Sequence, residues 1–332
     1  MASIVKRGPF QFQATIRRKG YPAQIKTFER KRDAEAWAHT IESECARGTF
    51  IDRSEAEQTT LKEALERYLR KVTPSKRGQA QEKTRINQLL RHPLASRSLA
   101  SLKSSDFARF RDDRLTQVSA NTTRLDLALI SNLFTVAKKD WSIPIENPIQ
   151  GIRKPKCGKG RDRRLVADEE SRLLAAAEDS LAPTLKLCIR LAIETGMRAG
   201  ELVGLRWEQI DLCDSAISLQ TTKNGDPRVV PLTEVAEELL RALPRPLHGG
   251  RLTSFHDSNG LSAAFRRCCI RAGIEDLRFH DLRHEAASRM APKMSAPTLA
   301  KVFGWKTLQM AMRYYNPTGS ELVAAVRGQK VA

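Results

Sequence analysis

The sequence predicts a mainly α-helical, multidomain protein with small β elements. Its 332 residues are enough for two or three domains. Apolar residues recur at helical spacing through the middle and last parts of the chain, whereas the alternation typical of strands is confined to the N-terminal part and one hairpin. A hydrophobic content of 41% and a charged content of 29% are typical of globular proteins, which excludes a disordered chain.

Residues 1–58 are predicted to form a small unit with strands and one helix. Apolar side chains alternate from Phe10 to Ile16, which indicates a strand with one buried face. A turn separates this strand from a second extended piece that runs toward Phe28. A helix with one apolar side follows, and Gly48 is its predicted stop.

Residues 59–145 are predicted to be entirely helical, because apolar residues recur at the spacing of one helix face. Asn121 or Thr122 is the expected N-cap of the last helix, and shorter helices are expected near residues 86–90 and 107–115. The two strongest apolar stripes are Leu61, Ala64, Leu65, Tyr68 and Leu69, and Leu125, Ala128, Leu129, Leu133, Val136 and Ala137.

Residues 146–164 are predicted to be a basic linker, because proline and glycine interrupt them repeatedly. Residues 165–332 form the last and largest domain, whose pattern is mostly helical over residues 173–178, 185–193, 261–272 and 284–290. One hairpin interrupts this pattern: residues 216–220 and 228–232 flank a turn that contains Asn224-Gly225.

The charge balance points to a polyanionic partner. The chain carries 57 Lys and Arg against 38 Asp and Glu, a net charge of +19, and nucleic acid is the usual partner of such a surplus. An anionic membrane is the weaker alternative, because the most apolar stretch is short and contains Arg190. Residues 1–10 hold no apolar segment of signal-peptide length.

The six cysteines show neither the spacing of a zinc site nor a disulfide framework. Adjacent Cys268 and Cys269 are expected to be buried helix residues. We therefore expect no metal and a reducing, cytoplasmic location.

Two basic segments are the predicted DNA-binding surfaces, although each could also be a solvated face or a linker charged for solubility. Between Lys6 and Arg32 there are nine basic residues and one acid, Glu29. Between residues 153 and 164 there are seven basic residues and one acid, so this strap could wrap a phosphate backbone. The residues predicted to contact DNA are Lys6, Arg7, Arg17, Arg18, Lys19, Arg153, Lys154, Lys156, Lys159 and Arg161.

Four short motifs of the last domain could carry chemistry, although each alone is more often structural. Arg198 follows Gly196 near a helix start, where a guanidinium and free N–H groups could hold an anion; it could equally be a surface arginine paired with Glu201. Lys223 precedes the hairpin turn, and His280 and Arg283 share a helix face. Trp305 and the Tyr314-Tyr315 pair complete the set.

In this order, Arg, Lys, His-x-x-Arg, Trp and Tyr resemble the active-site signature of the tyrosine recombinases, the phage-integrase-like site-specific recombinases, which include the shufflon-type invertases. Arg198 stands in a T-G-x-R-x-x-E-L stretch, and a second His follows Arg283. Trp305 takes a position that is His in most members. Tyr314 has the family's usual spacing to that position, and spacing alone favours it over Tyr315.

The resemblance implies the fold and the domains: a three-stranded arm-type DNA-binding module (1–58), a helical core-binding domain (59–145), a basic linker (146–164) and a catalytic domain of tyrosine recombinase type (165–332). The implied reaction is DNA cleavage and rejoining through a 3′-phosphotyrosine, without metal, ATP or other cofactor. Integration, excision or inversion of a DNA segment would all use it, as in mobile genetic elements.

The resemblance also implies a role for each residue. Tyr314 would be the nucleophile and His280 its general base, while Lys223 would protonate the leaving 5′-oxygen. The remaining catalytic residues would bind the phosphate: Arg198 and Arg283 through their guanidinium groups, and Trp305 through its indole N–H.

The implied partners are double-stranded DNA with specific recombination sites, further copies of the chain and accessory DNA-bending proteins. The copies would form a dimer on one site and a tetramer in the synapse, with the helix near residues 321–326 packing on a neighbour. Two alternatives remain: a DNA-binding or architectural protein without catalysis, and a topoisomerase-like enzyme that relaxes DNA.

Overall fold

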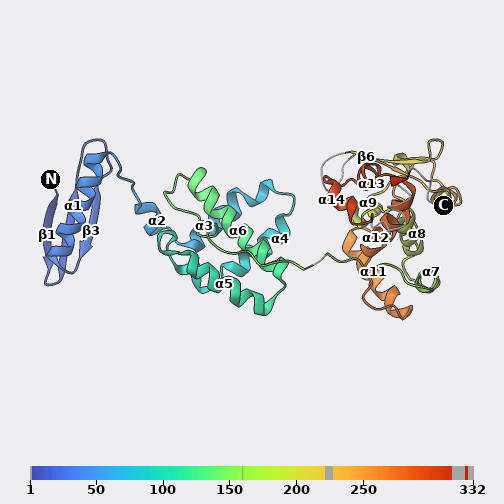
Figure 1. The fold of residues 1–332 in the computed structure, drawn as a ribbon, viewed down its shortest axis with the longest axis horizontal. Helices are drawn as coiled ribbons and strands as arrows, with labels where there is room; N and C mark the ends of the chain where they lie inside the picture. Colours follow the sequence, from blue (N-terminus) through green and yellow to red (C-terminus); the bar gives the residue numbers. More distant parts are fainter. Residues whose placement is uncertain (1, 159, 221–226, 316–325, 328–332) are drawn as a thin grey trace. The chain divides into compact units, whose positions relative to one another are not determined.

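The structure is a computed structural model that describes residues 2–158, 160–220, 227–315 and 326–327 (Figure 1). The chain divides into two compact units, Met1–Lys159 and Gly160–Ala332. The division falls inside the segment that the sequence predicts to be a linker. The first unit contains the N-terminal module and the helical segment, and the second contains all the predicted catalytic residues.

The N-terminal module is a three-stranded antiparallel sheet with one helix against it, as the family resemblance predicts (Figure 1). Ala14 and Ile16 are buried as the alternation predicts, but Phe10 lies in the preceding turn and is 76% exposed. The helix ends at Gly48, the predicted stop. The elements are β1 (Ser3–Gly8), β2 (Gln11–Ile16), β3 (Gln24–Phe28) and α1 (Lys31–Arg47).

The helical segment packs around one apolar core. Its helices are α2 (Ser54–Gln58), α3 (Leu61–Lys71), α4 (Gln79–Leu89), α5 (Ser104–Gln117) and α6 (Ala120–Lys139). The predicted stripe on α3 is confirmed at Leu61, Ala64, Leu65 and Tyr68, which are buried.

One expectation for α6 is wrong, and another is confirmed only in part. Its N-cap is Ser119, whose hydroxyl accepts the N–H of Thr122, so the helix starts before the predicted caps. The predicted apolar stripe is confirmed at Leu129, Leu133 and Ala137, which are buried, but Leu125 is exposed, and three apolar residues outside the stripe are buried as well. These are Leu127, Ile130 and Phe134.

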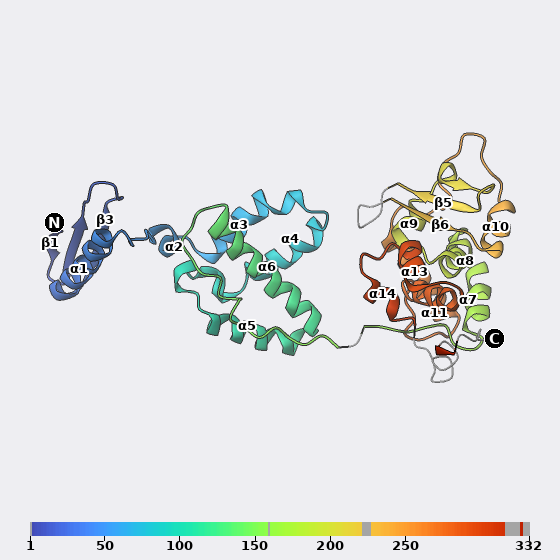
Figure 2. The same ribbon diagram turned by 45° about the horizontal axis from the view of Figure 1, so that its top comes forward.

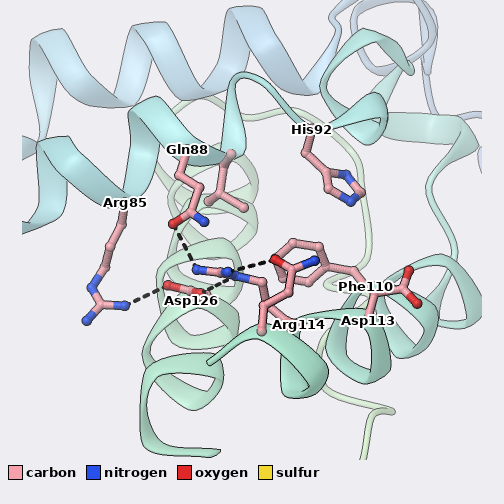
Figure 3. A pocket seen from close by; sticks show the side chains of 9 residues that line it. Arg85, Gln88, His92, Phe110, Asp113, Arg114 and Asp126 are labelled. Atoms are coloured by element: carbon pink, nitrogen blue, oxygen red, sulfur yellow. Dashed lines mark hydrogen bonds and ion pairs between the residues drawn. The ribbon is translucent and has the colours of Figure 1, made fainter. Parts of the chain in front are cut away.

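A buried carboxylate holds three of these helices together (Figure 3). Asp126 of α6 accepts hydrogen bonds from Arg85 of α4 at 2.6 Å and from Arg114 of α5 at 3.1 Å. Arg114 also donates to the side chains of Gln88 and Gln117. The Arg114 guanidinium therefore donates to carboxylate and amide oxygens of the same helical segment. We interpret the pocket that these side chains line as part of a structural hydrogen-bond network.

Residues at both ends of the predicted linker pack against the two units. Ile149 and Ile152 are buried in the core of the helical segment, and Pro148 accepts a hydrogen bond from Ser104. At the other end, Arg161 pairs with carboxylates of the second unit. Each end of the predicted linker therefore packs on one of the two units.

The second unit is mostly helical, with a small antiparallel sheet in the order β4-β5-β6 at one edge (Figure 2). The predicted hairpin is present as β5 and β6, whereas the two-residue β4 was not predicted. The elements are α7 (Glu169–Glu178), α8 (Leu185–Thr195), α9 (Ala199–Val203), β4 (Ile210–Asp211), β5 (Ala216–Leu219), β6 (Arg228–Pro231), α10 (Glu234–Arg241), α11 (Ser258–Arg271), α12 (Asp281–Met290), α13 (Ala296–Phe303) and α14 (Leu308–Met312).

All six cysteines are free thiols, and Cys268 and Cys269 are buried in α11 as expected. Among the residues that the structure describes, no group of three or more His, Cys, Asp or Glu is placed to hold a metal ion. None of the described helices is long and apolar enough to cross a membrane.

Candidate active site

The structure brings five of the six predicted catalytic residues to one side-chain cluster in the second unit. They come from the turn before α9, the start of α12 and the segments that follow α13 and α14. The cluster consists of Arg198, His280, Arg283, Trp305 and Tyr314, and the contacts that join them are described below. The sixth residue, Lys223, lies outside the described residues.

Gly196 allows the sharp turn that places Arg198. It ends α8 with a left-handed φ of +62°, and a Cβ there would lie 2.4 Å from the ring of Phe303. A glycine is therefore required both by the backbone conformation and by the close packing of α8 against the end of α13. The chain then leaves α8 and starts α9 directly after Arg198.

Arg198 is held by the carboxylate of Glu201. Its Nη1 donates to Glu201 Oε1 at 2.7 Å, and its backbone N–H donates to Oε2 at 2.8 Å. Nη2 also donates to the Gly304 carbonyl at 3.3 Å. The pairing of a surface arginine with Glu201 is thus present, but the Arg198 side chain is only 18% exposed and belongs to the cluster.

Sequence reasoning missed Arg228, a buried arginine on β6. Its Nη2 donates to Glu201 Oε2 at 2.7 Å, and its Nη1 donates to the Val302 carbonyl. Glu201 therefore bridges two guanidinium groups that are 30 residues apart in sequence. Only the R-x-V-P pattern of the predicted strand could have drawn attention to Arg228, and nothing in that pattern names its partner.

Arg283 of α12 is almost fully buried, with 4% of its surface exposed. Nη1 donates to the Gly196 carbonyl at 2.5 Å, and Nη2 donates to the Phe303 carbonyl. Its guanidinium also lies over the Phe303 and Trp305 rings, 4.8 Å and 5.6 Å from their centres. The backbone carbonyls thereby fix the direction of the guanidinium before any ligand arrives.

Burial lowers the pKa of Arg283, and the nearby Arg198 and Arg228 lower it further. Glu201 is the carboxylate that opposes this effect. Three positive groups thus share one counter-charge, so an anion between them would relieve their repulsion. The cluster has the electrostatics of a phosphate-binding site.

Trp305 stacks on Tyr314. The two rings are parallel within 3°, and their centres are 5.4 Å apart. The centres of the Phe303 and Trp305 rings are 4.8 Å apart. This stacking places the Tyr314 ring beside the guanidinium of Arg283. Burial raises the pKa of Tyr314, while Arg313 and Arg283 oppose this effect.

The Tyr314 hydroxyl contacts Nδ1 of His284 on α12. His284 directly follows Arg283 of the predicted His-x-x-Arg motif, and no catalytic role was predicted for it. The His280 ring meets the His284 ring edge-on at 5.4 Å. Burial lowers the pKa of both histidines, and the neighbouring Arg283 lowers each pKa further.

The other tyrosine of the pair points elsewhere. The Tyr315 hydroxyl donates to the Met294 carbonyl at 2.5 Å, in the segment before α13. Its position is that of a packing residue. Of the two tyrosines, Tyr314 is the one whose ring stacks on Trp305 and whose hydroxyl contacts His284 of α12.

The predicted DNA-binding residues differ in how much of each side chain is exposed. Those of the N-terminal module are exposed, as are Arg153, Lys154 and Lys156 of the strap. Lys159 lies outside the described residues. Arg161 differs from the prediction, because its guanidinium is occupied by Asp276 and Asp281 within the second unit.

Comparisons with known proteins agree with this fold and site. The description "Phage integrase, N-terminal domain" matches residues 57–156, and "Phage integrase family" matches residues 163–321. The shufflon-specific DNA recombinase of Escherichia coli is 38% identical over 82% of this chain and 72% of that protein. The integrase of Escherichia phage HK022 is 26% identical over 83% of this chain and 81% of its own length.

A solved structure, a lambda integrase dimer bound to a COC′ core site, has the same fold with a TM-score of 0.67. Its sequence is 21% identical to that of this chain, and the match covers 96% of this chain and 95% of the lambda integrase chain. The fold and the relatives together define a tyrosine recombinase.

The chain belongs to the phage integrase family. It is a site-specific DNA recombinase, an enzyme that cleaves and rejoins DNA strands through a 3′-phosphotyrosine. The family and the fold class predicted from the sequence are confirmed.

Proposed function

We propose that Tyr314 is the nucleophile of this recombinase and that the guanidinium groups of Arg198 and Arg283 hold the scissile phosphate. The observation that carries the proposal is the position of Tyr314, whose hydroxyl contacts His284 of α12 while its ring is stacked on Trp305. The Tyr314 oxygen attacks phosphorus, the bond to the 5′-oxygen breaks, and a 3′-phosphotyrosine and a 5′-hydroxyl result. The reverse attack by the 5′-hydroxyl of another strand rejoins the DNA.

His284 is the proposed acceptor of the Tyr314 proton. A tyrosine has a reference pKa of about 10 and needs a base at neutral pH, and Nδ1 of His284 touches its hydroxyl. The lowered pKa keeps His284 neutral at pH 7, so Nδ1 can accept the proton when the ring carries its own proton on Nε2. His280, the base expected from the sequence, contacts the His284 ring.

The two arginines would stabilise the charge that builds on the non-bridging oxygens in the transition state. The carbonyls of Gly196 and Phe303 aim Arg283, and Glu201 aims Arg198. Lys223 stays the proposed acid for the leaving 5′-oxygen. Trp305 is proposed to hold the Tyr314 ring in place by stacking on it. The sequence predicts a different role for Trp305, a contact with the phosphate.

The proposed partner is double-stranded DNA with specific recombination sites, bound in the cytoplasm. Exposed basic residues of the strap and of the N-terminal module support this proposal. Solved lambda integrases are a dimer on a core site and a tetramer on a Holliday junction, and we propose the same assemblies for this chain. Similarity to a shufflon-specific recombinase supports inversion among the rearrangements it could perform. Residues 321–325 of the helix expected at a neighbour lie outside the described residues.

A suicide substrate tests the proposed nucleophile. A nicked duplex that loses a short strand after cleavage traps the covalent adduct, which is counted on a denaturing gel. We expect an adduct with the wild type and with Tyr315→Phe, in the presence of EDTA, and none with Tyr314→Phe. An adduct that survives Tyr314→Phe and disappears with Tyr315→Phe would overturn the assignment, and a strict Mg²⁺ requirement would overturn the mechanism.

A further inference from the structure

The C-terminal end of the basic strap is bound tightly to the elements that carry the catalytic residues. Residues 160–165, here called the strap end, belong to the second unit. Three arginines of the strap end pair with carboxylates that lie on α12, before it, or at the start of α7. The sequence predicts a DNA contact for one of them, Arg161.

Arg161 makes the most extensive of these contacts. Its Nε donates to both oxygens of Asp281, at 2.8 Å and 3.0 Å, and its Nη2 donates to Oδ2 at 2.8 Å. Nη1 donates to the two oxygens of Asp276 at 3.0 Å and 2.9 Å, and Nη2 also reaches the Asp276 carbonyl. The fork of the guanidinium is therefore filled by two carboxylates, and a DNA phosphate would have to displace them.

Asp281 connects Arg161 to the catalytic helix. It is the first residue of α12, it is 2% exposed, and it also accepts the backbone N–H of Arg278 at 2.8 Å. His280 precedes it directly, and Arg283 lies two residues further along the same helix. A shift of Asp281 would move the start of α12 and with it both catalytic side chains.

The same residue of the strap end also contacts the segment of the nucleophile. Nη2 of Arg313 donates to the Arg161 carbonyl at 3.2 Å. The guanidinium of Arg313 occupies the space beside Gly160, where a Cβ would lie 2.7 Å from Nη2. Because Arg313 precedes Tyr314, Arg161 touches the α12 start through its side chain and the nucleophile segment through its carbonyl.

Two further pairs hold the strap end in place. Arg164 donates to the buried carboxylate of Glu285 on α12 through Nε and Nη2, both at 3.2 Å. Arg163 forms a two-pronged pair with Glu169 at the start of α7. The strap end thus follows the catalytic helix over more than one turn.

We propose that Arg161 is a positioning residue that sets α12 and the Tyr314 segment relative to each other. The proposal rests on the proposed function, since it matters only if Tyr314 and Arg283 act in cleavage. In this role the strap does more than connect two DNA-binding units. Its end is part of the scaffold of the active site, because Arg161 contacts both the start of α12 and the residue before Tyr314.

The test compares DNA binding with the cleavage rate for Arg161→Gln in the full-length protein. The probe is a suicide duplex carrying the recombination site of the enzyme, and the rate is the single-turnover rate of adduct formation at saturating DNA. Misplacement of reacting groups by about 1 Å can cost up to ~100-fold in rate. We expect a 10- to 100-fold lower rate with a dissociation constant within about 2-fold of wild type.

Arg241→Gln is the matched control. Arg241 also pairs with a carboxylate, Glu237, and donates to a carbonyl, that of Leu212, but it lies on α10 away from the cluster. It should cleave like the wild type. Arg161→Lys keeps the charge but loses the fork, and we expect it to recover part of the rate lost in Arg161→Gln.

Asp276→Asn provides a second route in case Arg161→Gln, which leaves the buried Asp281 without its arginine, does not fold. It removes only the exposed partner of Arg161 and leaves Asp281 paired, so a smaller loss of rate at unchanged affinity is expected. A wild-type cleavage rate in Arg161→Gln would overturn the proposal. If Arg161→Gln does not fold, a wild-type cleavage rate in Asp276→Asn would overturn it.

Weaker DNA binding by Arg161→Gln with a normal saturated rate would also overturn it, because Arg161 would then be a DNA contact. The test separates this proposal from the proposed function: absence of a Tyr314 adduct in the wild type would refute the latter. A normal wild-type adduct with unaffected variants would refute only the role of Arg161.

Discussion

The Tyr314 hydroxyl lies against Nδ1 of His284, one helical turn beyond the histidine that the sequence pattern singles out. The rings of His280 and His284 are neighbours, but only the His284 ring contacts the nucleophile Tyr314 directly. This difference leads to a prediction about which histidine takes the proton.

We expect His284→Gln to lower the single-turnover cleavage rate by about 10²- to 10⁴-fold, the usual contribution of a positioned base. His280→Gln is the comparison, because it removes the other ring without removing the Tyr314 contact, and its effect should be smaller. DNA affinity should change little in either variant. The opposite ranking would return the role of general base to His280.

The pH profile of cleavage follows from the same site. Burial lowers the pKa of His284 below its usual 6.5, so the base stays neutral at pH 7 and becomes protonated only at lower pH. The single-turnover rate should therefore rise with pH, through an apparent pKa below 6.5, and level off near neutrality. In His284→Gln this acid limb should disappear, and a limb that persists unchanged would assign it to another group.

Glu201 pairs with both Arg198 and the buried Arg228, which makes its charge important for stability as well as for catalysis. Burial raises its pKa, but Arg228 and Arg198 lower it more strongly, so the carboxylate is ionised. Glu201→Gln would leave the buried Arg228 without a counter-charge. Breaking such a pair costs about 3–5 kcal/mol.

We expect Glu201→Gln to lower the free energy of unfolding by about this amount and to slow cleavage at saturating DNA. Glu237→Gln is the matched control, because Glu237 pairs with the exposed Arg241 and should change stability by less than about 1 kcal/mol. Urea denaturation measures both. Equal stabilities of the two variants would show that Glu201 does not compensate the buried charge.

Much of the site could be predicted from the sequence, because its residue types stand in a recognisable order. Arg198, His280, Arg283, Trp305 and Tyr314 are all brought to one cluster. The partners of these residues could not be predicted in the same way. Arg228, for example, meets Glu201 across 27 positions, and spacing along the chain carries no signal for such a pair.

The partners of the basic residues could not be predicted from the sequence either. Composition shows that the strap is positively charged, but it does not show which charges face solvent. Arg161 finds its carboxylates 115 and 120 residues away, so a residue predicted to contact DNA is used within the fold. The α6 face was also predicted only in part, because tertiary packing buries Leu127 and Ile130 beside the predicted Leu129 and Leu133.

Gly196 should be among the least replaceable residues of the catalytic unit. An alanine there would adopt an unfavourable positive φ and place its methyl group against the Phe303 ring. We expect Gly196→Ala to lower the free energy of unfolding by about 1–3 kcal/mol or more. Gly200→Ala is the matched control, because Gly200 lies in α9 with nothing within 4 Å of its added methyl group.

Thermal and urea unfolding of the two variants test this prediction. Gly200→Ala should be neutral or should stabilise the protein by up to about 1 kcal/mol, the helix-propensity difference between the two residues. Equal effects of the two substitutions would mean that neither the turn nor the contact with Phe303 constrains Gly196.

The strap also permits a test of its predicted DNA contacts. Lys154 and Lys156 are exposed, in contrast to Arg161, so their charges can reach a phosphate. If each neutralises about one phosphate, replacing both by Gln should weaken binding and reduce the slope of log K against log salt by about 2. Arg241→Gln removes a charge of the catalytic unit away from the strap and should leave the slope unchanged. Fluorescence anisotropy with a labelled duplex at several salt concentrations measures the slope. A double variant with the wild-type slope would mean that these lysines serve only to keep the strap in solvent.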